Sequence, residues 1–184
     1  MSVSAILTLV SWLLIPLSAL FLARGADPFC ASFSSLCAVP ARRPEFLLWC
    51  AFTGGYFFWL LTGLFPRTEK KSARLLPDLC LLLLLWAALL PYRPREDPLC
   101  ARLHVLCALG SALCLLICLY RLAFRLYFRS PRQGRRPLLI LNVSLLFCAL
   151  SWIATGIINA AMEICLVCTA SVQLRYFIRV QREI

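Results

Sequence analysis

Histidine is nearly absent from this sequence of 184 residues, and acidic residues are few. The chain contains one histidine and 8 aspartates and glutamates. A zinc site needs clustered cysteine and histidine ligands in polar loops, which one histidine does not supply. The sequence also contains no Gly-x-Gly-x-x-Gly, Walker A, His-Glu-x-x-His or Gly-x-Ser-x-Gly motif. We therefore expect no metal and no cofactor, and nothing indicates a common type of nucleotide-binding enzyme, metalloprotease or serine hydrolase.

Basic residues are missing from the start of the sequence, ahead of the first hydrophobic run. Met1 to Ala5 contains no lysine or arginine, and the apolar run continues through Leu22. A secretory signal peptide usually has a basic segment followed by a shorter apolar core. We therefore expect the first run to be a membrane-spanning helix.

Hydrophobic residues are abundant, at 62% of the chain, with a mean hydropathy of +0.85. Soluble domains average roughly 45–50% apolar residues. Runs of membrane-spanning length recur along the sequence, without room for a separate soluble domain. We predict an all-α, polytopic integral membrane protein, a bundle of six transmembrane helices in one domain over residues 1–184. The expected spans are about 5–22, 46–65, 75–90, 99–119, 138–156 and 158–179.

The run from Leu138 to Leu174 determines the number of spans. As one helix it would measure about 55 Å, against ~30 Å for the hydrocarbon core of a bilayer. Its only glycine, Gly156, lies beside Thr155 and Asn159. We therefore predict two helices joined by a tight turn over residues 155–159.

The net charge of +11 has two interpretations, nucleic-acid binding or membrane topology. The basic residues lie in short loops between apolar runs, which favours topology and no nucleic-acid partner. With six spans, 13 of the 19 lysines and arginines fall on one side, which should be cytoplasmic. Both termini are then cytoplasmic, and we expect the plasma membrane as the location.

This threading places several polar residues at one depth near the outer leaflet. Ionisable residues inside a membrane are costly and often functional. A structural hydrogen bond between His104 and Glu163 is the alternative to a binding pocket, and the sequence leaves both open. The candidate pocket residues are Glu45, His104, Ser151, Thr155, Asn159 and Glu163.

Cysteines and arginines suggest two further sites. Cys30 and Cys37 in an outward loop, with Cys165 and Cys168 in the last span, could relay electrons by thiol–disulfide exchange. This arrangement resembles the vitamin K epoxide reductase type, although cysteines in apolar runs usually act as small hydrophobes.

The helix of the fourth span should continue past the membrane, because arginines recur every four residues and suit lipid headgroups. These are Arg121, Arg125 and Arg129.

The first outward loop carries a family resemblance. Asp27-Pro28-Phe29, Ser32 to Leu36, and Arg43-Pro44-Glu45-Phe46 resemble the DRAM/Sfk group of six-span membrane proteins and its bacterial relatives of unknown function. Cys37 stands where that group has glycine, and the turn lacks its aspartate. The resemblance implies a six-helix bundle linked to lipid or membrane organisation, without an established enzyme activity.

Three functions follow as hypotheses. The first is a multi-pass membrane protein of unknown biochemical activity, non-enzymatic, whose outer-leaflet pocket binds a lipid or small amphiphile. The second is a membrane thiol–disulfide oxidoreductase that uses the four cysteines named above. The third is a small transporter or intramembrane hydrolase that uses His104 and Glu163. Membrane lipids are the expected partners in each case.

Overall fold

The computed structural model describes the backbone of residues 3–65 and 71–183, and the side chains of 4–36, 38–65 and 75–181. Within these ranges all regular secondary structure is helical and no strand occurs, which confirms the all-α prediction. The helices are α1 (Val3–Leu9), the π-helix η1 (Val10–Leu14), α2 (Ile15–Leu22), α3 (Phe33–Cys37), the 3₁₀-helix η2 (Pro40–Arg42), α4 (Arg43–Leu64), α5 (Lys71–Leu89), α6 (Pro98–Arg129), α7 (Pro131–Thr155) and α8 (Ala160–Glu183).

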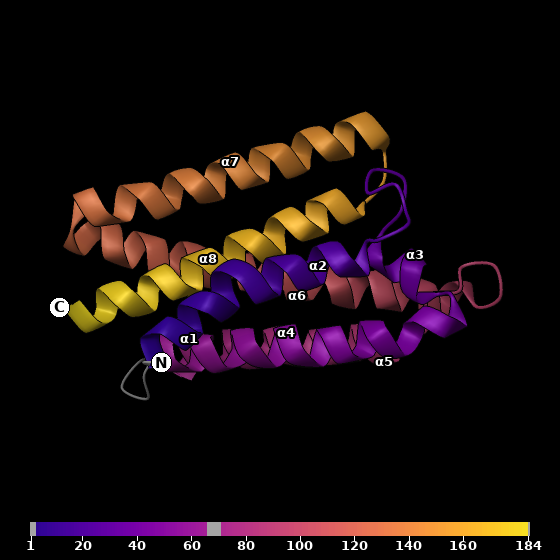
Figure 1. The fold of residues 1–184 in the computed structure, drawn as a ribbon, viewed down its shortest axis with the longest axis horizontal. Coiled ribbons are helices and arrows are strands. Elements are labelled where there is room, and N and C mark those ends of the chain that lie inside the picture. Colours follow the sequence, from indigo (N-terminus) through magenta and orange to yellow (C-terminus); the bar gives the residue numbers. More distant parts are fainter. Residues whose placement is uncertain (1–2, 66–70, 184) are drawn as a thin grey trace. The chain divides into compact units, whose positions relative to one another are not determined.

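The chain folds into two compact units. Unit 1 comprises Met1–Phe33 and Leu119–Ile184, and unit 2 comprises Ser34–Cys118. In unit 1, η1, α2 and α7 pack against α8, and α7 and α8 run side by side in opposite directions (Figure 1). In unit 2, α4 packs against α5. The prediction of a single membrane domain over residues 1–184 stays a prediction.

Five helical segments of the described chain are long and apolar enough to cross a membrane. They are Ser4–Leu22, Pro40–Leu64, Pro98–Arg129, Pro131–Thr155 and Ala160–Gln181. The apolar part of α5, Leu75–Leu89, is shorter. It measures about 22 Å, against ~30 Å for a hydrocarbon core. The predicted span 75–90 is therefore not among the five.

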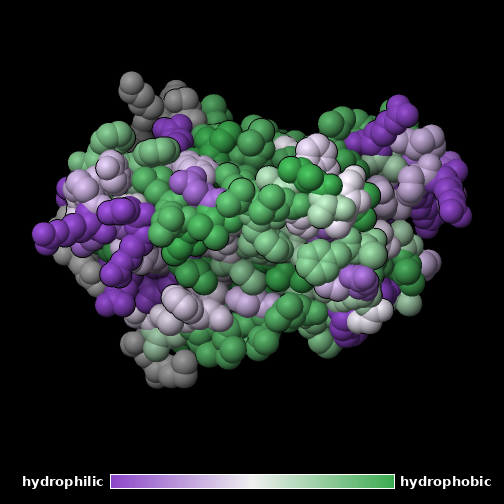
Figure 2. All heavy atoms as spheres, turned by 90° about the horizontal axis from the view of Figure 1, so that it is seen from above, coloured by the Kyte–Doolittle hydropathy of each residue, from purple (hydrophilic) through white to green (hydrophobic). Residues whose placement is uncertain are grey.

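The surface of these helices is apolar along their length. On α7 one face carries five large apolar side chains that are between 57% and 74% exposed, namely Leu139, Val143, Leu146, Leu150 and Ile153. In the view of Figure 2, hydrophobic side chains cover the middle of the helices and hydrophilic ones gather toward their ends. An apolar face of this size suits lipid rather than water, as in membrane proteins.

The first span is a single helix with a π-helical turn before Pro16. The N–H of Ile15 donates to the carbonyl of Val10, five residues earlier, and Pro16 has no N–H. The carbonyl of Ser11 therefore lacks a donor from its own helix. The Ser171 hydroxyl of α8 donates to it instead, at 2.7 Å. A side chain of α8 thus supplies the hydrogen bond that the proline removes from the neighbouring helix; we call this proline repair.

A second proline defect lies in α7 and is repaired in the same way. Pro137 supplies no N–H to the carbonyl of Gln133, four residues earlier. The Tyr176 hydroxyl donates to that carbonyl at 3.1 Å. Gln173 Nε2 donates to the carbonyl of Pro137 at 3.0 Å. Two residues of α8 therefore stabilise the backbone of α7 around Pro137. The helix begins at Pro131, seven residues before the predicted start at 138.

The hairpin between α6 and α7 turns on one residue. Ser130 is extended, with φ −147° and ψ 96°, and Pro131 begins α7. The residue before a proline avoids the helical region, which ends α6 here. A side chain at Gly134 would overlap the backbone of Tyr127 in α6, so glycine permits this close approach. The continuous helix Pro98–Arg129 confirms that α6 extends past the predicted span 99–119.

The predicted break in the long apolar run is confirmed. α7 ends at Thr155, and Gly156 adopts the left-handed conformation, with φ +69°, that glycine favours at a helix end. α8 begins at Ala160, and Asn159 Oδ1 accepts a hydrogen bond from the N–H of Met162 at 3.1 Å. Asn159 is therefore the N-cap of α8.

Candidate functional site

The N-terminus of α8 is where the loop after α2 meets the α7–α8 turn. The first four N–H groups of a helix have no partner within it. Here Ala160 N donates to Ala31 O at 2.7 Å and Ala161 N to Pro28 O at 3.0 Å. Asn159 accepts from Met162 N through its side chain and from Glu163 N through its carbonyl, at 3.2 Å. The bond from Glu163 N is the first within the helix, and the N–H groups of Ala160, Ala161 and Met162 ahead of it all have acceptors. These three donors are therefore not open to an anion.

Glu163 holds the same loop from the first turn of α8. Its Oε2 accepts a hydrogen bond from the N–H of Phe33, the first residue of α3, at 2.6 Å. The Phe33 ring is 3% exposed, so the bond lies at a protected site. The carboxylate therefore anchors the loop 23–33 to α8. This structural role differs from the hydrogen bond to His104 that the sequence analysis weighed against a functional one.

Three of the predicted pocket residues form one polar cluster in unit 1. Asn159, fully buried, donates through Nδ2 to Ser151 Oγ at 2.9 Å and to Thr155 Oγ1 at 3.2 Å. Thr155 Oγ1 also donates to the carbonyl of Ser151 at 2.9 Å. The cluster ties the end of α7 to the start of α8. Both polar atoms of the Asn159 side chain, Nδ2 and Oδ1, have hydrogen-bond partners. The cluster therefore stabilises the turn and leaves neither atom available to a ligand.

His104 in unit 2 is buried, with 1% of its surface exposed. Its Nδ1 lies 3.0 Å from the carbonyl of Leu90, which can only accept, so Nδ1 carries a proton. Its Nε2 lies 2.7 Å from Ser34 Oγ, and the Tyr92 ring centroid is 5.5 Å away. The histidine thereby fixes the loop between α5 and α6. Its pairing with Glu163 of unit 1 stays a prediction.

Glu45 belongs to unit 2 and lies exposed in the first turn of α4. A carboxylate there is favoured by the helix dipole. The structure therefore brings together Ser151, Thr155, Asn159 and the adjoining Glu163, whereas His104 and Glu45 are held in the other unit.

The cysteines of the predicted relay are free thiols where the structure describes them. Cys30 is an exposed thiol that donates to Asp27 Oδ2 at 3.3 Å. This hydrogen bond to a carboxylate raises the pKa of the Cys30 thiol, which lowers its thiolate fraction and its reactivity. The Cys37 side chain lies outside the described residues. Cys165 and Cys168 are free thiols one turn apart on α8, and the Cys165 side chain interacts with Cys148 of α7.

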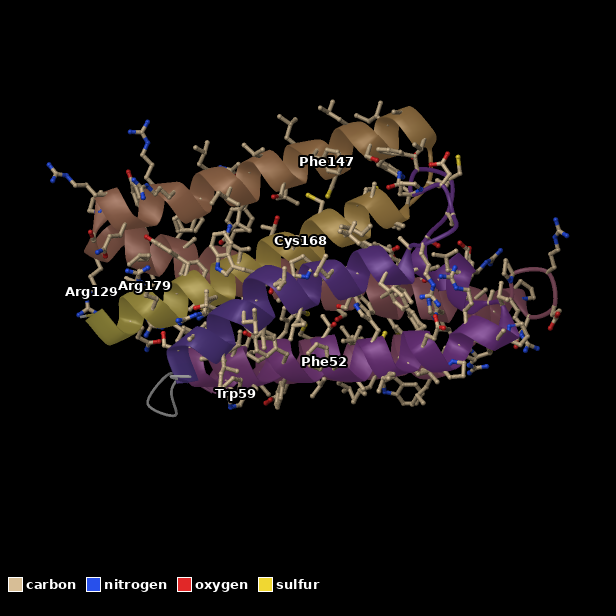
Figure 3. All side chains as sticks on the ribbon, in the orientation of Figure 1. Phe52, Trp59, Arg129, Phe147, Cys168 and Arg179 are labelled. Atoms are coloured by element: carbon tan, nitrogen blue, oxygen red, sulfur yellow. The ribbon has the colours of Figure 1, made fainter. Side chains whose placement is uncertain are left out.

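A groove borders this end of unit 1, which we call the turn-end groove. Its volume is about 570 Å³, and its main lining residues are Leu20, Arg24, Phe29, Phe147, Ile164 and Cys165. Arg24 donates to the carbonyl of Phe21 at 3.1 Å, and its guanidinium lies 3.7 Å from the centroid of the Phe21 ring. The turn-end groove is therefore mostly apolar, with a positive charge on its border. Figure 3 shows Phe147 on α7.

The sequence did not identify the residues that line this groove. Phe147 and Ile164 are ordinary apolar residues of a span, and Arg24 was counted only as a loop charge. The one available signal was that Arg24 follows directly after an apolar run, where an arginine can meet a headgroup. Packing of α2, α7 and α8 creates the groove, and that packing has no sequence motif.

The predicted headgroup arginines lie on the C-terminal part of α6. Arg121, Arg125 and Arg129 are exposed. Three aromatic rings stack along the same helix, with centroid distances of 6.1 Å from Tyr120 to Phe124 and 6.4 Å from Phe124 to Phe128. Aromatic and basic side chains at a helix end suit a membrane interface. Their contact with lipid stays a prediction.

The described residues contain no group of three or more histidine, cysteine and acidic side chains that could hold a metal ion. Comparison with protein families, curated proteins and solved structures finds no match for this chain. Fold and surface together are those of a helical, multi-pass membrane protein.

Proposed function

We propose that this chain is a non-enzymatic membrane protein that binds an anionic amphiphile in the turn-end groove. The main supporting observation is that the turn-end groove is mostly apolar, has a volume of about 570 Å³ and carries Arg24 on its border. Ligand pockets are typically concave and mostly apolar, with few polar groups that orient the ligand. An acyl chain would lie along Leu20, Phe147 and Ile164, and an anionic head would meet Arg24.

The proposal includes the membrane arrangement on which the groove depends. We propose six spans, with α5 as the third, both termini in the cytoplasm and the groove toward the outer leaflet of the plasma membrane. The tight α7–α8 turn supports this threading, since it returns the chain at once. So does the basic character of the loops on the proposed cytoplasmic side. The resemblance to the DRAM/Sfk group agrees with six spans and with lipids as partners.

Two observations favour binding over the two catalytic alternatives. The thiol relay needs a reactive thiolate, and the hydrogen bond to Asp27 raises the pKa of Cys30. A hydrolase or transporter that used His104 and Glu163 needs them free for a substrate. Glu163 bonds to Phe33, and both His104 nitrogens have partners in unit 2.

Photo-crosslinking tests the groove. The full chain in dodecyl maltoside would be incubated with palmitic acid bearing a diazirine at mid-chain, irradiated and digested. We expect labelled peptides from residues 20–29 and 161–165. Ile164→Trp fills the groove and Arg24→Gln removes its charge, so both should lose most of this labelling. Leu150→Trp is the control, because Leu150 is 57% exposed on α7 and does not line the groove. Equal labelling of wild type and Ile164→Trp would contradict the proposal.

A further inference from the structure

The second inference concerns the other end of unit 1, where the start of the first span meets the end of α8. Arg175 of α8 is buried, with 6% of its surface exposed. Its Nε donates to Thr8 Oγ1 at 3.1 Å. Its Nη2 donates to the Ser4 carbonyl at 3.1 Å and to Ser4 Oγ at 2.6 Å. All three acceptors are neutral oxygens.

The positive charge of Arg175 is therefore hydrogen-bonded but not neutralised. Among the described side chains no carboxylate lies within ion-pair distance of it. A buried charge is costly unless an opposite charge accompanies it. A guanidinium has five N–H groups, and the described atoms accept from Nε and Nη2 only. The two N–H groups of Nη1 remain for a ligand.

A cavity of about 520 Å³ adjoins this guanidinium, which we call the terminal cavity. It is lined by Ser4, Thr8 and Trp12 of the first span and by Val172, Arg175, Tyr176 and Arg179 of α8. Two guanidinium groups and two hydroxyls thus border one space, and none of the described residues that line it is acidic. The Tyr176 hydroxyl already donates to Gln133, so this residue forms a wall of the cavity.

The donor geometry selects the chemical class of the ligand. Arg175 and Arg179 are four residues apart, on one face of α8. Arginine forks match the oxygens of phosphate in pairs. The Ser4 hydroxyl can add a single donor, whereas the Thr8 hydroxyl already donates to the Ser4 carbonyl. Trp12, which is 61% exposed, provides an apolar surface beside them, as a lipid requires and a free ion does not. Figure 3 shows Arg179 and Arg129 at the same end of unit 1, where a headgroup layer would also meet the α6 arginines.

We propose that the terminal cavity binds the phosphate of an anionic phospholipid headgroup, with Arg175 and Arg179 as its ligands. The anion would supply the charge that Arg175 lacks and lock the first span against α8. This site is separate from the turn-end groove and does not depend on an amphiphile there. A membrane lipid bound here would stabilise the packing of the two helices that carry the chain ends.

Calorimetric titration of the purified full chain in dodecyl maltoside tests the site with three probes. These are dihexanoyl phosphatidic acid, dihexanoyl phosphatidylcholine and inorganic phosphate. We expect saturable binding of phosphatidic acid and much weaker binding of the other two. Arg179→Gln should weaken it about tenfold, the usual effect of removing one charge-assisted contact. Arg175→Lys keeps the charge but loses the fork, so it should weaken binding several-fold while preserving the fold.

Arg132→Gln is the matched control, because Arg132 is exposed, lies outside the cavity and gives the same change in net charge. Its binding should equal that of the wild type. Binding of inorganic phosphate as tight as that of the lipid would keep the phosphate site but overturn the lipid as its source. No saturable binding of either, or equal loss in Arg132→Gln and Arg179→Gln, would overturn the site itself.

Discussion

At the scale of single residues, Glu163 is the side chain whose role the structure specifies most closely. Its carboxylate accepts from the N–H of Phe33. Glu163→Gln keeps an acceptor oxygen, whereas Glu163→Leu leaves that N–H without one, at a cost of ~1–3 kcal/mol. We therefore expect Glu163→Leu to lower the free energy of unfolding in detergent by that amount, and Glu163→Gln by clearly less. Equal losses for the two variants would contradict the anchoring role.

A suitable control for that comparison is Glu96→Leu. Glu96 forms an exposed ion pair with Arg93 at 3.0 Å, and such surface pairs contribute about 0–1 kcal/mol. We expect Glu96→Leu to unfold nearly as the wild type does.

Asp27 and Cys30 form the second residue-scale test. The hydrogen bonds from the Phe29 N–H and the Cys30 thiol hold the pKa of Asp27 below its usual 3.8. A depressed carboxylate pKa means that these bonds stabilise the turn above that usual value and are lost only as pH falls through the lowered pKa. The turn should therefore be unchanged between pH 5 and 8.

Asp27→Asn removes the negative charge that raises the pKa of Cys30. The thiolate fraction of Cys30 should rise, so its alkylation by iodoacetamide at pH 7.5 should become at least ~2-fold faster. Peptide-level mass spectrometry measures this rate, with Cys100 as an internal reference that the substitution should not affect. An unchanged rate at Cys30 would show that Asp27 does not control this thiol.

At the scale of helices, α8 repairs both proline defects of its neighbours, and a double-mutant cycle tests this. Tyr176→Phe leaves the Gln133 carbonyl without its donor and should cost about 0.5–1.5 kcal/mol. Pro137→Ala restores the helical N–H to that carbonyl, so in this background the same change at Tyr176 should cost much less. Unfolding in detergent measures all four proteins. A cost of Tyr176→Phe that is the same in both backgrounds would contradict the repair.

The helices also show which parts of the fold were accessible from sequence. The α7–α8 break was predicted because Gly156 and Asn159 are a helix stop and a helix start in a run too long for one span. The start of α7 was predicted at 138 because the apolar run begins there, whereas the helix begins at Pro131. Its polar first turns include Pro137, and the Tyr176 and Gln173 side chains of α8 bond to the backbone there.

The candidate sites were accessible only in part for a related reason. Ser151, Thr155 and Asn159 were found because polar residues are conspicuous in an apolar run, and their contacts confirm that they lie together. Arg175 lies near the end of the predicted span 158–179 and entered the prediction only as one of the 13 basic residues on the cytoplasmic side. Its burial depends on Ser4 and Thr8, more than 160 residues away in sequence, and no local pattern indicates such a contact.

At the scale of the whole molecule, the central claim is that the chain crosses the membrane six times, because this places the turn-end groove toward the outer leaflet. Whether the chain crosses five or six times depends on the short apolar part of α5, Leu75–Leu89. If α5 crosses, the loops before and after it lie on opposite sides. A helix of ~22 Å can span by local thinning of the bilayer, at a modest cost.

Cysteine accessibility in intact cells measures this most directly. In a background without native cysteines, Glu96→Cys and Thr68→Cys flank α5, and Thr68 lies outside the described residues. Ala26→Cys and Gln133→Cys are the outer and inner references. We predict that a membrane-impermeant maleimide labels Glu96→Cys and Ala26→Cys from outside, and labels Thr68→Cys and Gln133→Cys only after permeabilisation. Labelling of Thr68→Cys and Glu96→Cys from the same side would contradict the account.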